Sequence, residues 1–168
     1  RSRFDEQLKL LNRKMTEMGG ECESIIAAAG KALLQGSAED ARQAQEQGHR
    51  IDQLEREIES ICLKLLLQQQ PVARDLRTIS AAMKMVTDLQ RIGDQCANIA
   101  EISLLLKEQK QTRTLADIRT MSQKAGVMVK RSIFAYVNRD TEAAQAVIAL
   151  DDEVQSPSLT SSVPVSMP

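Results

Sequence analysis

Apolar residues recur every three or four positions along most of this chain, which is the spacing of one face of an α-helix. The first such segment runs from about residue 5 to residue 34, with apolar positions at Leu8, Leu11, Met15, Met18, Cys22, Ile25, Ile26, Ala29 and Leu33. Gly36 interrupts the pattern, and Ser37 has a side chain suited to capping the helix that follows. The sequence therefore predicts a long first helix that ends before Gly36.

Two further helical segments follow. The second extends to about residue 68 through Ala41, Ala44, Ile51, Leu54, Ile58, Ile61, Cys62 and Leu65. The third carries Leu76, Ile79, Met83, Val86, Leu89, Ile92, Cys96, Ile99 and Leu104. Pro71 separates them, because proline disfavours helical dihedrals in the residue before it, and it is suited to opening the third helix. Three long helices with short links predict an antiparallel, up-down-up bundle.

The pattern then begins again about a hundred residues later. Adding 103 to a residue number relates Met18 to Met121, Ile25 to Met128, Ile26 to Val129, Ala32 to Ala135, Ala41 to Ala144 and Ile51 to Val154. The turn at residues 36–40 falls on residues 139–143, so a fourth helix is expected over residues 115–137 and a fifth from Thr141. A duplication explains the common offset, and chance agreement between amphipathic helices is the alternative.

The predicted fold is all-α: a tandem three-helix bundle, spectrin-repeat-like in plan, with an incomplete second repeat. We expect the first repeat at residues 1–107, the first part of the second at 108–155, and a disordered tail at 156–168, which is rich in Ser and Pro and lacks charge. Two helices alone would leave an apolar stripe uncovered. A partner chain completes the unit, the two helices pack on the first bundle, or the chain is truncated; the sequence leaves these options open.

Composition narrows the class of protein. Aromatic residues make up 2% of the chain, there is no Trp, and the net charge is -1 with both signs interspersed. This balance is typical of helical bundles and lacks the clustered Lys and Arg that nucleic-acid binding needs. No signal sequence and no long apolar run is present, so we expect a cytoplasmic protein without an integral membrane segment. The three cysteines lack CxxC spacing, which favours buried, reduced thiols.

A polar line crosses the apolar pattern of the third helix. Arg91, Asp94 and Asn98 lie three or four residues apart and so share one helix face. A polar line beside a packing seam indicates a site, and we expect it to face the second helix. The alternative is a helical scaffold or adaptor without a ligand, which has no need of such a line.

Several short segments, taken in order, carry a family resemblance. They are Phe4-Asp5-Glu6-Gln7-Leu8, Met15-x-x-Met18-Gly19, Arg50-Ile51-Asp52-x-Leu54-Glu55, Ile58-Glu59-x-x-Cys62, the stretch from Gln69 to Arg77, and Arg91-Ile92-Gly93-Asp94 with Asn98-Ile99. Up to about Val154 the chain resembles the PhoU family, the accessory and regulatory proteins of bacterial phosphate uptake. The 103-residue offset agrees with that family's two tandem three-helix repeats.

The resemblance implies a function and partners. A PhoU-like protein would be a cytoplasmic regulator of phosphate uptake and of phosphate-responsive signalling. Its implied partners are the ATPase subunit of the phosphate ABC transporter and a sensor histidine kinase, and homodimers are expected.

The resemblance also implies a metal site. PhoU-like proteins carry an acid followed four residues later by Asp on facing helices, and such carboxylates suit Mg, Mn or Fe. Here the third-helix motif has Gln90 before Asp94, and the second-helix motif has Gly48 before Asp52. Because acids of the motif are missing, a full multinuclear cluster is not expected. Asp52 and Asp94 remain candidates for one cation, with Gln90 as an amide-oxygen ligand.

In the second repeat Asp151 is present, but Gln155 replaces its partner acid, so Asp151 is the fourth candidate ligand. The alternative to metal binding is that these acids are solvated or paired with arginine, for instance Asp94 with Arg91 or Arg50. Both interpretations remain open at the level of sequence.

Arg74, Arg77, Arg91 and Asn98 are the candidate partner-binding residues, since the arginines could contact acidic groups of a partner. Ordinary solvated helix faces are the alternative. Catalysis is not expected: Glu46-x-x-His49 gives half of a di-iron signature, but His49 is the single histidine of the chain. We expect His49 to be an exposed helix residue.

Overall fold

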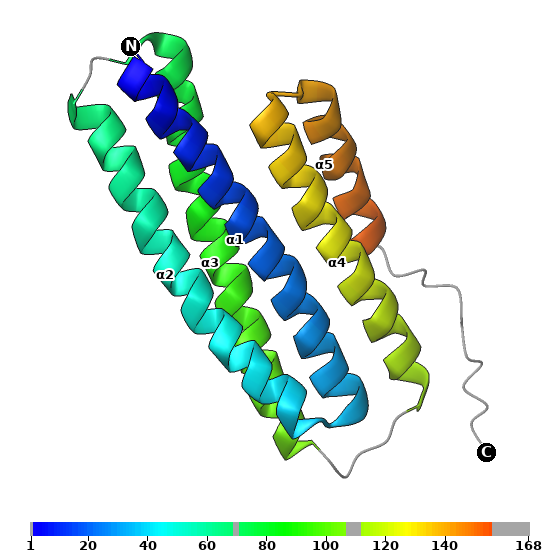
Figure 1. Ribbon diagram of the computed structural model, residues 1–168. Coiled ribbons are helices and arrows are strands. Elements are labelled where there is room, and N and C mark those ends of the chain that lie inside the picture. The colour runs from blue at the N-terminus through cyan, green and yellow to red at the C-terminus, as the bar shows by residue number, and fades with distance from the viewer. Residues whose placement is uncertain (1, 69–70, 107–111, 156–168) are drawn as a thin grey trace, which may run out of the picture.

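The structure is a computed structural model that describes residues 2–68, 71–106 and 112–155, and side chains within 2–67, 71–106 and 116–152. These residues form five helices and no strand, which confirms the predicted all-α fold (Figure 1). The helices are α1 (Ser2–Gln35), α2 (Ala38–Gln68), α3 (Ala73–Leu105), α4 (Thr112–Asn138) and α5 (Thr141–Gln155). The tail predicted to be disordered, residues 156–168, lies outside the described residues.

Helices α1, α2 and α3 form the predicted up-down-up bundle, and each packs against the other two (Figure 1). Its centre is aliphatic, as expected from the scarcity of aromatic residues. The largest fully buried side chains are Leu11, Met15, Met18, Ile25, Ile51, Leu54, Ile58, Ile79 and Val86. Burial of these side chains is the main force that holds the three helices together.

Helix α4 lies along α1, and α5 packs on the outer side of α4 (Figure 1). Val129 and Ile133 of α4 are buried in the core of the first bundle. Near the end of α4, the Tyr136 hydroxyl donates a hydrogen bond to the carbonyl oxygen of Thr78 on α3, at 3.4 Å. The second unit thus packs on the first bundle, which is one of the arrangements that the sequence left open, and α4 makes that contact.

The turns after α1 and α4 have the same backbone design, 103 residues apart. Gly36 has a φ of 62° and its counterpart Arg139 a φ of 54°, so both lie in the left-handed region. The next residue caps the following helix in each case: Ser37 Oγ accepts from the Asp40 N–H at 3.1 Å, and Asp140 Oδ1 accepts from the Ala143 N–H at 2.9 Å. The sequence offset therefore extends to backbone geometry and capping.

Helix α3 begins two residues later than Pro71, so the prediction that Pro71 opens it is wrong. Val72 is the N-cap, with φ -67° and ψ 156°, and its carbonyl oxygen accepts from the N–H groups of Asp75 and Leu76. The extended ψ of Val72 postpones the first helical turn to Ala73.

The apolar stripe expected on the third helix is buried only in part. Leu76 is 47% exposed, Met83 37% and Ile99 42%. Helix α3 packs against α1 and α2, but in the described part of the chain its backbone does not approach α4 closely. Helix α3 therefore keeps some of its apolar side chains at the surface.

Candidate functional site

Asp52, Gln90 and Asp94 meet where α2 passes α3. The side-chain nitrogen of Gln90, Nε2, donates to Asp52 Oδ1 at 3.2 Å and to Asp94 Oδ2 at 2.8 Å. Asp52 and Gln90 are half-buried, and Asp94 is exposed. The structure thus brings together three of the four predicted metal ligands, and the amide of Gln90 joins the two carboxylates.

Small residues allow α2 and α3 to approach closely at this point. A Cβ atom on Gly93 would lie 3.0 Å from Ile51 Cδ1, and one on Gly48 would lie 3.5 Å from the Cβ of Ala97. The side-chain nitrogen of Gln45 on α2 also donates to the carbonyl oxygen of Ala97, at 3.0 Å. This close approach is what places Asp52 of α2 opposite Gln90 of α3.

The side chains around this contact are mainly negatively charged. Burial raises the pKa of the Glu55 carboxyl, and the negative charges of Glu59, Asp52 and Asp94 raise it further, while Arg56 lowers it. The carboxylates on the two sides of the α2–α3 contact therefore repel one another. This part of the surface attracts positive charge as a result.

The side chains present do not fit the cation site expected from the family resemblance. A cation needs oxygen ligands, but Gln90 presents its amide nitrogen to both carboxylates, and an amide N–H₂ group cannot ligate a metal. Within the described residues, no three His, Cys, Asp or Glu side chains come together as a possible metal cluster. A cation between Asp52 and Asp94 stays a prediction that would require the amide to turn over.

Arg91 does not pair with Asp94, and the suggested ion pairs of Asp94 with Arg91 or Arg50 are wrong. Arg91 Nη1 lies 3.6 Å from Asp88 Oδ1, and Arg50 pairs with Glu17 instead. Residues three apart point about 60° away from each other around a helix, so Arg91 and Asp94 can face different neighbours. The expected polar line is therefore split: Asp94 lies beside Gln90 near α2, and Arg91 points to the neighbouring flank of α3.

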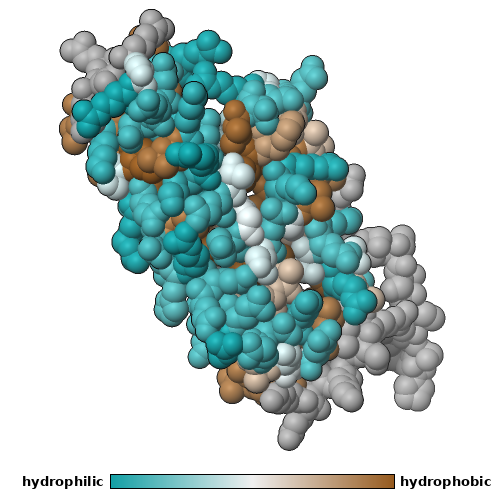
Figure 2. All heavy atoms as spheres, viewed as in Figure 1, coloured by the Kyte–Doolittle hydropathy of each residue, from teal (hydrophilic) through white to brown (hydrophobic). Residues whose placement is uncertain are grey.

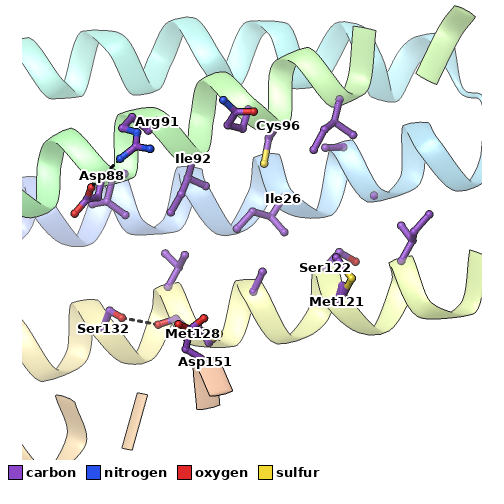
Figure 3. A pocket seen from close by; sticks show the side chains of 18 of the residues that line it. Ile26, Asp88, Arg91, Ile92, Cys96, Met121, Ser122, Met128, Ser132 and Asp151 are labelled. Atoms are coloured by element: carbon purple, nitrogen blue, oxygen red, sulfur yellow. Dashed lines mark hydrogen bonds and ion pairs between the residues drawn. The ribbon is translucent and has the colours of Figure 1, made fainter. Parts of the chain in front are cut away.

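The flank of α3 that carries Arg91 borders an open apolar groove of about 810 Å³. Its walls come from α1, α3 and α4, with Ile26, Ile92, Cys96, Met121 and Met128 among the lining residues (Figure 3). In the space-filling view, weakly polar and hydrophobic residues run along the seam between the first bundle and the α4–α5 pair (Figure 2). The sequence offset related Met121 and Met128 to apolar positions of the first helix, but it did not predict this groove.

The offset of 103 residues explains where the groove comes from. Ala125 and Met128, which line it, are the counterparts of Cys22 and Ile25 in α1. Those two α1 residues are fully buried, and Cys22 donates a hydrogen bond through Sγ to the carbonyl oxygen of Leu89 on α3, at 3.4 Å. The α4 wall of the groove thus corresponds to the face of α1 that α3 covers in the first bundle.

Charged residues border the groove. Asp88 and Arg91 stand together on the α3 side, and Asp151 of α5 lies beside Met128 on the other side (Figure 3). Asp151, the fourth predicted metal ligand, therefore lies in the second unit and takes no part in the Asp52–Gln90–Asp94 contact.

Exposed arginines and apolar side chains gather where α2 ends and α3 begins. Arg74 and Arg77 are exposed on the first turns of α3. Leu67 is 85% exposed, Val72 64% and Leu76 47%. We call Arg74, Arg77, Leu67, Val72 and Leu76 the basic end surface; it lies at the upper left of the molecule in Figures 1 and 2. Asn98, the fourth predicted partner-binding residue, is exposed farther along α3.

Other predictions about single residues are confirmed. Cys22, Cys62 and Cys96 are free and buried, and His49 is exposed. Of the helices in the described ranges, none combines the length and the apolar character that crossing a bilayer requires.

Comparisons with known proteins extend the geometric description. The PhoU domain matches residues 15–103 and 118–156 of the chain. A protein from Clostridium acetobutylicum, named phosphate-specific transport system accessory protein PhoU homolog, is 34% identical over 154 residues, which is 91% of this chain and 70% of that protein. A protein of the same name from Aquifex aeolicus is 34% identical over 149 residues, 89% of this chain and 67% of its own length.

A solved structure agrees with the fold. The crystal structure of PhoU from Pseudomonas aeruginosa matches with a TM-score of 0.85 and 31% sequence identity, over 90% of this chain and 73% of that one. The two segments matched by the PhoU domain lie on either side of the α3–α4 connection. The similarity therefore covers both units of the chain.

Proposed function

The chain belongs to the PhoU family, and on that basis we propose that it is an accessory protein that regulates phosphate uptake. The curated relatives are named as accessory proteins of a phosphate-specific transport system. A role through protein contact suits a bundle of long helices, which offers extended faces to partners. The proposed place of action is the cytoplasm.

We further propose that the chain binds the ATPase subunit of the phosphate ABC transporter and a sensor histidine kinase. The observation that supports contact with proteins is the basic end surface. Soluble proteins seldom expose large aliphatic side chains together, and Leu67, Val72 and Leu76 are all about half exposed or more. Arg74 and Arg77 are exposed on the first turns of α3 and would pair with carboxylates of a partner.

A surface of this composition predicts a partner segment that is apolar and acidic. The aliphatic side chains would supply the buried centre of the interface, and the arginines its charged border. Binding one conformation of the ATPase or of the kinase more tightly than another would shift that protein towards the bound conformation. Regulation in this form needs no chemistry from the chain itself.

A pull-down and a titration test the proposal. The native chain is expected to retain the phosphate-transport ATPase subunit at micromolar concentration. The double variant Arg74→Glu/Arg77→Glu should weaken that binding by about tenfold or more, because like charges then face the acidic partner. The control Arg119→Glu/Arg131→Glu makes the same change in net charge at exposed positions of α4 and should bind as the native chain does.

If the native chain retains neither the ATPase subunit nor the kinase at micromolar concentration, the ligand-free scaffold is the better account. If both double variants weaken binding equally, the contact depends on overall charge rather than on the basic end surface.

Homodimer formation is part of the same proposal, and it rests on the family resemblance. Light scattering coupled to size-exclusion chromatography measures the mass directly. A mass of twice 18.6 kDa is expected at micromolar concentration, and a single-chain mass across the accessible range of concentration would refute it.

A further inference from the structure

We propose that the amide of Gln90 takes the place of a cation between Asp52 and Asp94, so that α2 and α3 are held together here without a metal ion. The family resemblance implies an acid at the position of Gln90 and a cation between the carboxylates of facing helices. In this chain that position carries a neutral amide. The inference concerns this contact alone and does not depend on the proposed partners.

The hydrogen bonding has the connectivity of a bridging ion. The amide N–H₂ group carries two hydrogens, one for each carboxylate. Its nitrogen lies 3.2 Å from Asp52 Oδ1 on α2 and 2.8 Å from Asp94 Oδ2 on α3, in the range of hydrogen bonds to charged acceptors. One side chain of α3 thereby joins a carboxylate of its own helix to a carboxylate of α2.

The same amide opposes metal binding. A cation between the two carboxylates would have to take the position of the amide hydrogens, so both hydrogen bonds would be lost. If the amide then turned its oxygen inward, the protein would supply two carboxylates and one carbonyl oxygen. Mg²⁺ and Mn²⁺ prefer octahedral sets of six oxygens, and so most of the shell would remain water. Gln90 thus acts as an internal competitor for the cation position.

The close approach of α2 and α3 does not depend on a cation. Gly93 and Gly48 allow the backbones to approach, and the Gln45 side chain adds a hydrogen bond to Ala97 one turn beyond. Helix packing therefore already fixes how α2 and α3 are aligned where Gln90 makes its hydrogen bonds. A metal ion is not required to bring Asp52 and Asp94 near each other.

The test compares Gln90→Glu with Gln95→Glu in chelator-treated protein. Gln95 is exposed on the same helix and lines the groove, so its variant has the same charge without touching Asp52. We expect the Tm of the native chain and of Gln95→Glu to be unchanged by EDTA or by millimolar Mn²⁺. Gln90→Glu should have a lower Tm in EDTA, and saturating Mn²⁺ should raise it by about 4 °C or more.

Bound metal, measured by elemental analysis after desalting, gives a second readout. The native chain should retain none, and Gln90→Glu should retain Mn²⁺. The proposal is overturned if the native chain retains one Mn²⁺ or Fe²⁺ that Asp52→Asn abolishes. It is also overturned if Gln90→Glu gains neither metal nor stability, because Gln90 would then not be what separates this contact from a cation site.

A second variant tests the proposal even if Gln90→Glu folds poorly. Gln90→Met keeps the length of the side chain and removes both donor hydrogens, so it should lower the Tm in the presence and in the absence of Mn²⁺. An unchanged Tm in Gln90→Met would show that the amide does not hold the helices together and would overturn the proposal.

Discussion

A Cβ atom on Gly19 of α1 would lie 2.6 Å from Cγ1 of Ile133 on α4, so the backbone of α1 touches a side chain of α4 directly. Both residues are buried. Gly20, the next residue of α1, is exposed, and a Cβ atom there would meet nothing within 4 Å. The contact between the first bundle and α4 thus depends on the lack of a side chain at position 19.

Alanine at these two positions should change stability in opposite directions. Gly20→Ala should raise the free energy of unfolding by about 0.5–1 kcal/mol, because alanine restricts the unfolded chain and favours the helix. Gly19→Ala also favours the helix, but its added methyl group overpacks the contact with Ile133. The free energy of unfolding is therefore expected to fall by about 1–2 kcal/mol. Urea unfolding followed by circular dichroism measures both.

A second substitution identifies the cause. Ile133→Val, combined with Gly19→Ala, shortens the side chain that clashes and should recover part of the loss. If Gly19→Ala proves as stabilising as Gly20→Ala, α4 is not held against α1 at this point.

The family resemblance implied that Asp52 and Asp94 lie on facing helices, and helix periodicity was sufficient to predict the five helices and the antiparallel first bundle. These features follow from where apolar residues recur and from short links, both of which are local in the sequence. The turn at Gly36 was also predictable, because glycine and serine have specific roles at the end and start of helices.

Periodicity could not predict which neighbour each polar residue faces. Arg91 and Asp94 share a broad helix face, yet one lines the groove and the other lies beside Gln90 near α2, because the helices around α3 divide that face between them. The hydrogen bonds of Gln90 could not be foreseen either, since an amide can present its nitrogen or its oxygen and its neighbours decide which. The groove depends on how α4 lies against α1, which is a property of packing.

Arg139 is expected to weaken the turn between α4 and α5. Its φ of 54° is in the left-handed region, which is unfavourable for a residue with a side chain, whereas its counterpart Gly36 adopts a φ of 62° without strain. Arg139→Gly should therefore raise the free energy of unfolding by about 1 kcal/mol, and Gly36→Ala should lower it by about 1 kcal/mol. Urea midpoints measure both changes, and a loss of stability in Arg139→Gly would contradict the expectation.

Lys14 and Glu17 predict how stability depends on pH. A hydrogen bond from Lys14 to Glu57, and then one to Glu17, raises the pKa of the Lys14 ammonium above 10.5. Burial raises the pKa of Glu17, but hydrogen bonds from Lys14 and Arg50 outweigh it and leave the pKa below 4.5. Because the folded pKa of Lys14 is raised, its contribution is complete below 10.5 and is lost as the pH rises through the folded value.

For Glu17 the sign is reversed. Its folded pKa is lowered, so its contribution is present above pH 4.5 and is lost as the pH falls through the folded value. Glu17→Gln should flatten the acid side of the stability curve, by about 0.5 kcal/mol because the pair is partly exposed. Glu101→Gln, an exposed position on α3, serves as the control. Urea midpoints are measured from pH 3 to pH 7. If the midpoints of the two variants fall equally as the pH is lowered, Glu17 does not have the proposed role.

The three cysteines should react slowly with thiol reagents in the folded protein. Burial raises the pKa of Cys22 to about 12, with Cys96, Glu21 and Glu23 adding to the effect, and burial raises the pKa of Cys62 and of Cys96 to about 11. At pH 8 the thiolate fraction is about one thousandth for a pKa of about 11 and about one ten-thousandth for a pKa of about 12, and the thiolate is the reactive form. Labelling with iodoacetamide should therefore be slow in buffer and fast in urea.

The order of labelling adds a test of the groove. Cys96 is 8% exposed and lines the groove, whereas Cys22 and Cys62 are fully buried, so Cys96 should be modified first as the reaction proceeds. Peptide mass spectrometry identifies the labelled position, and Cys96→Ser should remove the early product. Early modification of Cys62 would instead mean that the bundle opens at α2 before reagent reaches the groove. That result would place the weakest part of the fold in the α2 seam rather than beside α4, because reagent can reach Cys62 only through a local opening of the helices around it.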